Sequence, residues 1–183
     1  MAHFITNGLN PFFVFTALYA LVALWETNVA QAILYLGVEL VAAVFVAGYV
    51  FRLRRQRRVG DFWISARAER VMPSLLLLLA FVVLLGALLF LGAPEMLFLT
   101  TFSMGLASTA VAATTLVWKA SAHSAVAGHA AMASLIVLGL TGLVFAIVLL
   151  LVLWARVASG VHTLPQGLAG AGIGAALAFV LLT

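Results

Sequence analysis

Two short strings of residues hold most of the side chains in this chain that are suited to acid, base or nucleophilic chemistry. The first runs from Lys119 to His123, and the second runs from Arg156 to His162. Lys119 and His123 are four residues apart, so on a helix they share one face. Both strings lie beside long apolar runs, where a charge at the bilayer centre costs at least ~2.5 kcal/mol and an ionisable group is a candidate for function.

Together with Arg67 and Arg70, the two strings predict a strongly positive pocket that contains two imidazoles. Histidine changes its charge near neutral pH and is suited to proton transfer. Arginine binds phosphate oxygens through a planar fork of donors, and lysine contributes a point charge. We therefore expect a phosphate group to occupy this pocket.

Acidic side chains, which metal-dependent hydrolysis would need as ligands, are scarce. Of the five Asp and Glu residues, Glu26, Glu39 and Glu95 lie far from both strings, and only Asp61 and Glu69 are near. We therefore expect no metal ion and no cofactor. The expected reaction is covalent: one histidine attacks phosphorus, the other protonates the leaving oxygen, and the cations stabilise the charge on the transferring group.

These residues resemble motifs of the type 2 phosphatidic acid phosphatases, a family that shares its site with the vanadium haloperoxidases. The family's motifs are KxxxxxxRP, PSGH and SRxxxxxHxxxD. Arg156, His162 and Gln166 are similar to the third motif, with its spacing complete. Ser121 and His123 are similar to the second, and the separation between the two motifs is also that of the family.

The first motif of the family is matched only in part. Arg70 and Pro73 resemble its RP end, but Trp63 stands in the place of the lysine. The resemblance covers about residues 61–183, which would form the phosphatase-like core. Residues 1–58 would add two N-terminal helices and a basic loop.

The resemblance implies a role for each matched residue. His162 would be the nucleophile, and His123 would be the acid that protonates the leaving group. Arg70 and Arg156 would bind the phosphate, and Ser121 would add a hydroxyl donor.

At two positions the chain departs from the family pattern. Lys119, or else Arg67, would supply the charge of the missing lysine. Gln166 occupies the place of the aspartate that orients the nucleophilic histidine and stabilises its charged form. A glutamine accepts a hydrogen bond from imidazole but brings no negative charge, so both an active enzyme and a weak or inactive one are consistent with the sequence.

The composition predicts an all-α, polytopic integral membrane protein that forms one domain over residues 1–183. Hydrophobic residues make up 66% of the chain and charged residues 8%, so its apolar runs must face lipid or each other. The chain has no cysteine, which excludes disulfides, thiolate metal sites and a cysteine nucleophile.

Breaks between apolar runs predict six or seven membrane-spanning helices. The run of about 31 residues over 124–154 is too long for one span, and we expect a hairpin that turns at Gly139 and Gly142. The hairpin would bring Lys119 and Arg156 to the same side of the membrane. The count is six if the first, short run does not cross. The expected spans cover about residues 11–25, 29–51, 73–91, 96–118, the two arms of 124–154, and the stretch after Pro165 to 183.

All nine Lys and Arg residues fall on one side of this predicted topology. Because cytoplasmic loops are enriched in Lys and Arg, that side is expected to be the cytoplasmic face of the cell membrane. The same cluster of arginines is suited to anionic lipid headgroups. The cluster consists of Arg52, Arg54, Arg55, Arg57 and Arg58.

Two further polar residues lie inside apolar runs. His129 is six residues beyond His123 and off its helical face, so we expect it to be a packing residue. Glu39 interrupts the second predicted span and is expected to pair with another helix or to line a cavity. Gly170 and Gly174 are spaced for close packing of the last helix against a neighbour.

The function expected from the sequence is that of a metal-independent membrane phosphatase. Its substrate would be the phosphate or diphosphate of an isoprenoid or a glycerolipid, and nucleic acid is not an expected partner. The alternatives are a catalytically weak or inactive protein of the same fold that binds or transports lipid phosphates, and a purely structural membrane subunit. The sequence leaves the lipid tail and the oligomeric state open.

Overall fold

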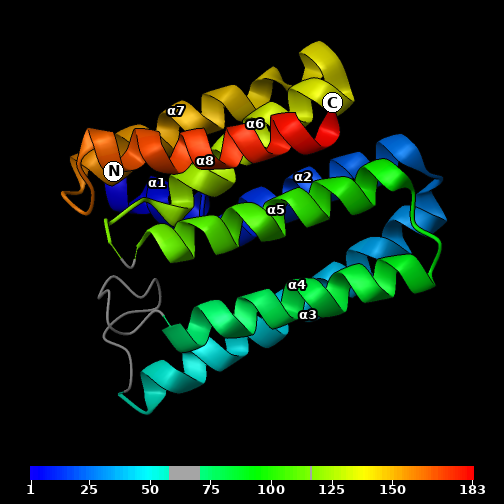
Figure 1. Cartoon of the computed structure of the whole chain (residues 1–183), viewed down its shortest axis with the longest axis horizontal. Coiled ribbons are helices and arrows are strands. Elements are labelled where there is room, and N and C mark those ends of the chain that lie inside the picture. Colours follow the sequence, from blue (N-terminus) through cyan, green and yellow to red (C-terminus); the bar gives the residue numbers. More distant parts are fainter. Residues whose placement is uncertain (58–70, 116) are drawn as a thin grey trace.

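Helices form the regular structure of the chain in the computed structural model, which describes residues 1–57, 71–115 and 117–183 (Figure 1). No strand occurs within these ranges. The α-helices are α1 (Ala2–Gly8), α2 (Pro11–Glu26), α3 (Val29–Arg55), α4 (Val71–Phe90), α5 (Glu95–Thr114), α6 (Ala122–Leu138), α7 (Leu143–Ala158) and α8 (Leu164–Leu182).

Five helical stretches in the described ranges are long and apolar enough to cross a membrane. Helix α2 is equally apolar but has only 16 residues. The chain is therefore a helical membrane protein, while the expected count of six or seven spans stays a prediction. The five stretches are Val29–Arg55, Met72–Phe90, Glu95–Thr114, Ala122–Ala158 and Leu164–Leu182.

The stretch Ala122–Ala158 is a hairpin, as expected. It divides into α6 and α7 at a 3-10 turn over Gly139–Gly142, and Gly139 has a φ of 62°, which favours glycine. The hydroxyl of Ser134 donates to the carbonyl of Gly142 at 3.0 Å, although eight residues of continuous helix would hold these residues ~12 Å apart. The chain therefore turns back, and α7 returns beside α6 (Figure 1).

Helices α6 and α8 run parallel and pack through their backbones. A Cβ added at Gly170 would overlap the carbonyl oxygen of Ser121, and one added at Gly174 would overlap that of Ala125. The expectation that Gly170 and Gly174 allow close packing is confirmed. Small residues at such positions let dispersion contacts and backbone approach hold helices together where lipid surrounds them.

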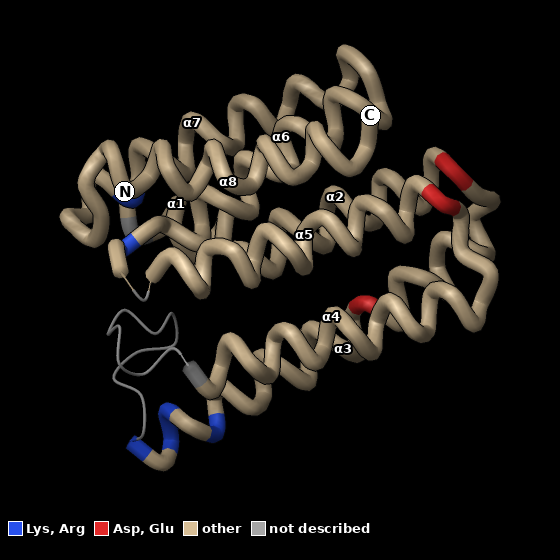
Figure 2. The backbone as a smooth tube through the Cα atoms, in the orientation of Figure 1, with Lys and Arg blue, Asp and Glu red and all other residues tan. Residues whose placement is uncertain are grey.

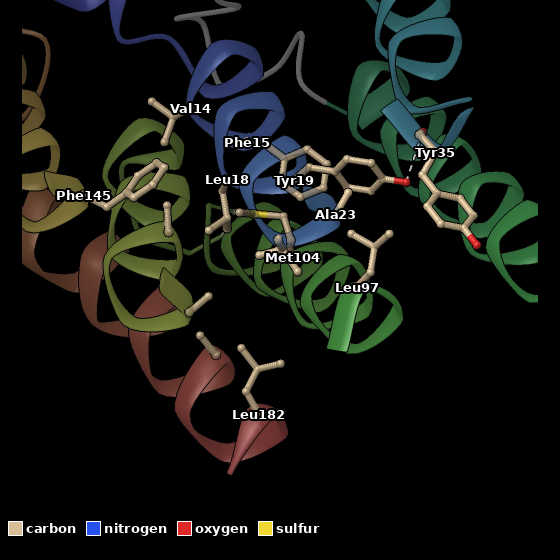
Figure 3. Close-up of a cluster of buried hydrophobic side chains, with 14 of the residues drawn as sticks. Val14, Phe15, Leu18, Tyr19, Ala23, Tyr35, Leu97, Met104, Phe145 and Leu182 are labelled. Atoms are coloured by element: carbon tan, nitrogen blue, oxygen red, sulfur yellow. Dashed lines mark hydrogen bonds between the residues drawn. The ribbon is translucent and has the colours of Figure 1, made fainter. Parts of the chain in front are cut away.

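Helix α2 lies in the middle of the bundle despite its short length. Leu18, Tyr19 and Val22 are fully buried, and α2 contacts α3, α5 and α6. Figure 3 shows Leu18 and Tyr19 beside Met104 of α5 in the main apolar cluster. The opposite face of α2 is exposed and also apolar, with Phe13, Leu21 and Leu24, so the helix has no polar face to present to water.

One helix was not expected, and two helix ends differ from the expected ones. Helix α1 was not predicted, because its sequence is short and has no helical apolar stripe. Helix α3 continues to Arg55 rather than ending near residue 51, since arginines in the last turn of a helix are stabilised by its dipole. Helix α5 ends at Thr114 rather than Trp118, where the hydroxyls of Thr114 and Thr115 bond to the last carbonyls.

Positive charge gathers at one end of the bundle. Figure 2 shows the described Lys and Arg residues at one end, and the described acidic residues at the opposite end or part-way along. The expectation that the basic residues share one side therefore holds for those described, whereas the assignment of that side to the cytoplasm stays a prediction. The described basic residues are Arg52, Arg54, Arg55, Arg57, Lys119 and Arg156.

Candidate active site

The α6–α7 hairpin and α8 bring the two polar strings together at the positive end of the bundle. His123 is in the first turn of α6, Arg156 is in the last turn of α7, and His162 lies between α7 and α8. Because α7 returns to the end where α6 began, residues about 40 positions apart become neighbours, as the contact between Lys119 and Val161 demonstrates.

Local turns position His162. Gly160 ends α7 with a φ of 69°, in the left-handed conformation that commonly ends helices at glycine. The backbone N–H of His162 then donates to the carbonyl of Arg156 at 3.2 Å. The chain therefore curls back over the end of α7 and sets the imidazole beside the last turn that carries Arg156.

Two hydrogen bonds join the first polar string to the segment that runs from Val161 to Gln166. The Nζ of Lys119 donates to the carbonyl of Val161 at 3.0 Å, and the backbone N–H of Ser121 donates to the carbonyl of Gln166 at 3.1 Å. Both bonds hold the start of α6 against the segment that carries His162. The relative positions of the two histidines are therefore set by direct contacts between the strings.

His123, Arg156 and His162 form the polar head of a central cavity. These three side chains are 7%, 6% and 7% exposed, and all three line one cavity of about 230 Å³. Arg156 and His162 are close enough to His123 to interact with it electrostatically. The structure thus brings together three of the residues that the sequence analysis selected.

Below the polar head, the central cavity is apolar. Its walls come from α2, α3, α4, α5 and α6, with Ser74, Ser108 and Thr115 as the hydroxyl-bearing members. The sequence analysis missed these lining residues, because an apolar residue that faces a cavity has the same type and spacing as one that faces lipid. The apolar walls include Phe12, Phe15, Val46, Val50, Leu77, Phe81, Met104 and Val111.

Ser121 and Lys119 are near the polar head but do not line the central cavity. Ser121 is fully buried and is the N-cap of α6, where its hydroxyl oxygen accepts from the backbone of Ser124 at 3.3 Å and from its hydroxyl at 3.0 Å. Lys119 is half-buried, with its ammonium group on the Val161 carbonyl. Their expected roles as phosphate ligands stay predictions.

Gln166 is part of the N-terminal cap of α8. Its Oε1 accepts from the backbone N–H of Thr163 at 3.1 Å, and Thr163 caps the helix in return. Such a capping box satisfies two backbone donors that the first turn leaves open. The expectation that Gln166 orients His162 stays a prediction.

Arg67 and Arg70, the other two expected phosphate ligands, lie outside the described residues, as do Trp63, Asp61 and Glu69. Pro73, three positions after Arg70, lines the central cavity beside Ser74.

His129 is a packing residue, as expected. It is fully buried, does not line the central cavity, and its Nε2 lies 2.7 Å from the hydroxyl of Ser103 on α5. The described residues contain no group of three or more His, Asp or Glu side chains arranged to hold a metal ion.

The polar head has the groups needed to hold an anion and to move a proton, and the cavity below it is suited to a hydrocarbon chain. Comparisons with protein-family models, with curated proteins and with solved structures find no match for this chain.

Proposed function

We propose that this protein is a membrane phosphatase that removes phosphate from a lipid phosphate or diphosphate without a metal ion. One observation carries the proposal: His123, Arg156 and His162 line the same cavity as the apolar walls of α2 to α5. An amphipathic ligand with an anionic head matches both parts of this cavity. Pockets that combine a few convergent polar groups with apolar walls are the usual sites of ligand binding.

In the proposed reaction, His162 attacks phosphorus and forms an N–P bond while the P–O bond to the lipid breaks. His123 gives its proton to the leaving oxygen, and Arg156 stabilises the negative charge on the phosphoryl group. His123 then takes a proton from water, which attacks the phosphohistidine and releases inorganic phosphate. The two histidines thus complete the cycle without a change in the net number of protons on the protein.

Phosphates and diphosphates of isoprenoids are the preferred substrates within this proposal, ahead of glycerolipid phosphates. The described part of the central cavity offers one continuous apolar space below the polar head, which matches a single branched chain. Phosphate release should therefore be measured with prenyl monophosphates, prenyl diphosphates and phosphatidic acid, with EDTA present.

The decisive comparison is between wild-type protein and His162→Ala. Wild-type protein should release phosphate and form an acid-labile phosphoprotein, and His162→Ala should do neither. His123→Ala should lower turnover by about 10²–10⁴-fold, the usual contribution of a general acid. A phosphohistidine at position 123 would contradict the assigned roles.

Arginine substitutions provide a matched control. Arg156→Ala removes a buried cation from the polar head, whereas Arg52→Ala removes an exposed one at the same end of the bundle. Turnover should fall strongly in the first variant and stay near that of wild type in the second. An equal loss of turnover in the two variants would indicate that Arg156 contributes only to the overall positive charge at this end of the bundle.

A lipid-phosphate binder without turnover is the second candidate. It is favoured by Gln166, whose Oε1 is engaged with the backbone of Thr163 and which brings no charge to His162. Binding of farnesyl phosphate without any phosphate release would establish this alternative. In the enzyme reading, Gln166→Asp is expected to raise turnover, because a carboxylate stabilises the charged imidazole.

The polar head is proposed to face the cytoplasm, on the same side as the arginines that end α3. The chain has no cysteine, so a single cysteine introduced at Arg55 gives a clean reporter. A membrane-impermeant thiol reagent should leave it unlabelled in intact cells and label it after lysis. Labelling in intact cells would contradict the proposed sidedness.

A further inference from the structure

We propose that the rings of Phe15 and Phe81 form an aromatic floor to the central cavity and set the length of lipid tail that it accepts. The proposal rests on the proposed function, because it identifies the occupant of the cavity as the tail of the lipid phosphate. It adds a property that the polar head cannot supply, since the head recognises only the phosphate.

The aromatic floor is built from two helices that meet across the cavity. Phe15 of α2 and Phe81 of α4 have ring centroids 5.7 Å apart at an interplanar angle of 64°, an edge-to-face arrangement. Both side chains are 8% exposed, and Tyr19 continues the cluster at 5.9 Å from Phe15. Edge-to-face pairs are favourable beyond their buried area, so the floor is a defined structure.

Gly105 on α5 makes room for the floor. A Cβ added at Gly105 would stand 3.2 Å from the Cγ of Phe81, closer than an ordinary contact. Phe81 therefore lies flush against the α5 backbone. The ring therefore leaves no gap for a tail against the α5 backbone at Gly105.

A second, smaller cavity of about 40 Å³ lies on the other side of the aromatic floor. Both rings line it, and so does Glu39, which is 3% exposed and accepts a hydrogen bond from the Thr16 hydroxyl at 2.9 Å. A hydrocarbon tip that entered this space would contact a carboxyl group. The other residues that line this space are apolar, so the floor separates the space for the tail from a small pocket that contains one buried carboxyl group.

The depth available to a tail follows from the lining residues of α5. They extend from Thr115, near the polar head, to Met104, beside the floor. Eleven residues of helix at ~1.5 Å each give a depth of ~16 Å. Ser108 lies between these two residues and faces the same space, so a larger side chain there would shorten the cavity.

The test uses tails with and without the phosphate. Geraniol, farnesol and geranylgeraniol, and the monophosphate of each, are added to wild-type protein in detergent, and the rise in melting temperature reports binding. The variants are Phe81→Ala, Phe81→Leu and Ser108→Phe. Val82→Ala is the matched control, because Val82 is the next residue of α4 and is exposed.

Both Phe81 variants should shift the ratio of affinities toward the longer tail by at least about tenfold, and Ser108→Phe should shift it toward the shorter tail. Val82→Ala should keep the wild-type ratio. Ser108→Phe and Phe81→Leu keep a large apolar side chain at the substituted position and retain most of the helix packing. These two variants therefore test the proposal if Phe81→Ala does not fold. An unchanged ratio in all variants that fold would overturn the proposal.

The alcohols separate this proposal from the proposed function. If the alcohols show the expected shifts but no phosphate is released from any monophosphate, the aromatic floor stands and the phosphatase proposal fails. If phosphate is released but the ratio of affinities for long and short tails is the same in all variants, the phosphatase proposal stands and the proposal of an aromatic floor is contradicted.

Discussion

The α6–α8 unit (α6, α7 and α8) and the α3–α4 pair are both apolar, but they are packed in opposite ways. In the α6–α8 unit, glycines bring helix backbones into contact, as at Gly128 against Ala171 and Gly174 against Ala125. The glycines of the α3–α4 pair make no such contact, because a Cβ added at Gly37, Gly48 or Gly86 meets nothing within 4 Å. Between this pair and the other helices lies the central cavity.

The difference assigns separate tasks to the two regions. All three residues of the polar head are carried by the α6–α8 unit, where close backbone contacts fix their relative positions. The α3–α4 pair supplies Val46, Val50 and Leu77 to the wall of the cavity. Under the proposed function, precise geometry is needed at the polar head, where bonds would be made and broken, whereas a wall for a hydrocarbon tail needs only apolar surface.

The largest expected effect comes from forcing the α6–α8 unit apart. In Gly174→Leu, the new Cβ would overlap the carbonyl oxygen of Ala125 and stand 2.8 Å from the backbone nitrogen of His129. Because backbone atoms cannot swing aside, the cost should exceed the ~1–3 kcal/mol of ordinary overpacking. Thermal unfolding in detergent should show loss of the cooperative transition.

Gly172→Leu is the matched control for Gly174→Leu. A Cβ at Gly172 meets nothing within 4 Å, and the residue is exposed on the same helix. Its melting temperature should stay close to that of wild type. Equal melting temperatures for the two leucine variants would show that α6 and α8 are not in backbone contact.

A smaller effect is expected from the link between α5 and the α6–α8 unit. Ser103→Ala removes the hydroxyl that lies 2.7 Å from Nε2 of His129, and it leaves a buried imidazole without this partner. The free energy of unfolding should fall by about 1–3 kcal/mol. Ser108→Ala is the control, because the Ser108 hydroxyl has no hydrogen-bond partner among the described residues; it should cost less than half as much.

The next smaller effect is expected at the N-terminal cap of α8. Gln166→Leu removes the side-chain oxygen that accepts from the Thr163 N–H, so the free energy of unfolding should fall by about 1 kcal/mol. Gln166→Glu is the control, because a glutamate keeps the capping box. Chemical denaturation of the two variants measures the difference. A leucine variant as stable as the glutamate variant would show that the bond between Gln166 and Thr163 is not formed in solution.

The smallest effect is expected where the α3–α4 pair meets α2. Tyr19→Phe removes the hydrogen bond from the Tyr19 hydroxyl to the carbonyl of Tyr35, which is 3.2 Å long (Figure 3). The carbonyl keeps its place in the hydrogen bonding of α3, so the loss should be about 0.5–1 kcal/mol. A loss as large as that of Ser103→Ala would remove the contrast between the two regions.

Much of this arrangement follows from features that can be read in the sequence. Pro11, Pro73 and Pro165 stand in the first turns of helices, and Gly139 marks the turn between α6 and α7. Once the hairpin is assumed, the polar strings must meet at one end. That step predicted the neighbourhood of His123, Arg156 and His162, all of which line the central cavity.

The rest depends on tertiary packing, which leaves no local signal. The bond from Lys119 to the Val161 carbonyl joins residues 42 positions apart, and the cap made by Gln166 competes with any role beside His162. Phe15 and Phe81 differ in no local respect from the many exposed apolar residues. Which aromatic residues face a cavity is decided by how α2, α4 and α5 pack together.

The bond between Glu39 and Thr16 has a consequence for how the protein enters the membrane. A carboxylate at the middle of an isolated helix adds about 2.5–3.5 kcal/mol to the free energy of insertion by the translocon. Thr16 is on α2, which is made before α3 and is too short to be a strong span by itself. Helices α2 and α3 are therefore expected to leave the translocon together as one hairpin, with the hydroxyl already bonded to the carboxyl group.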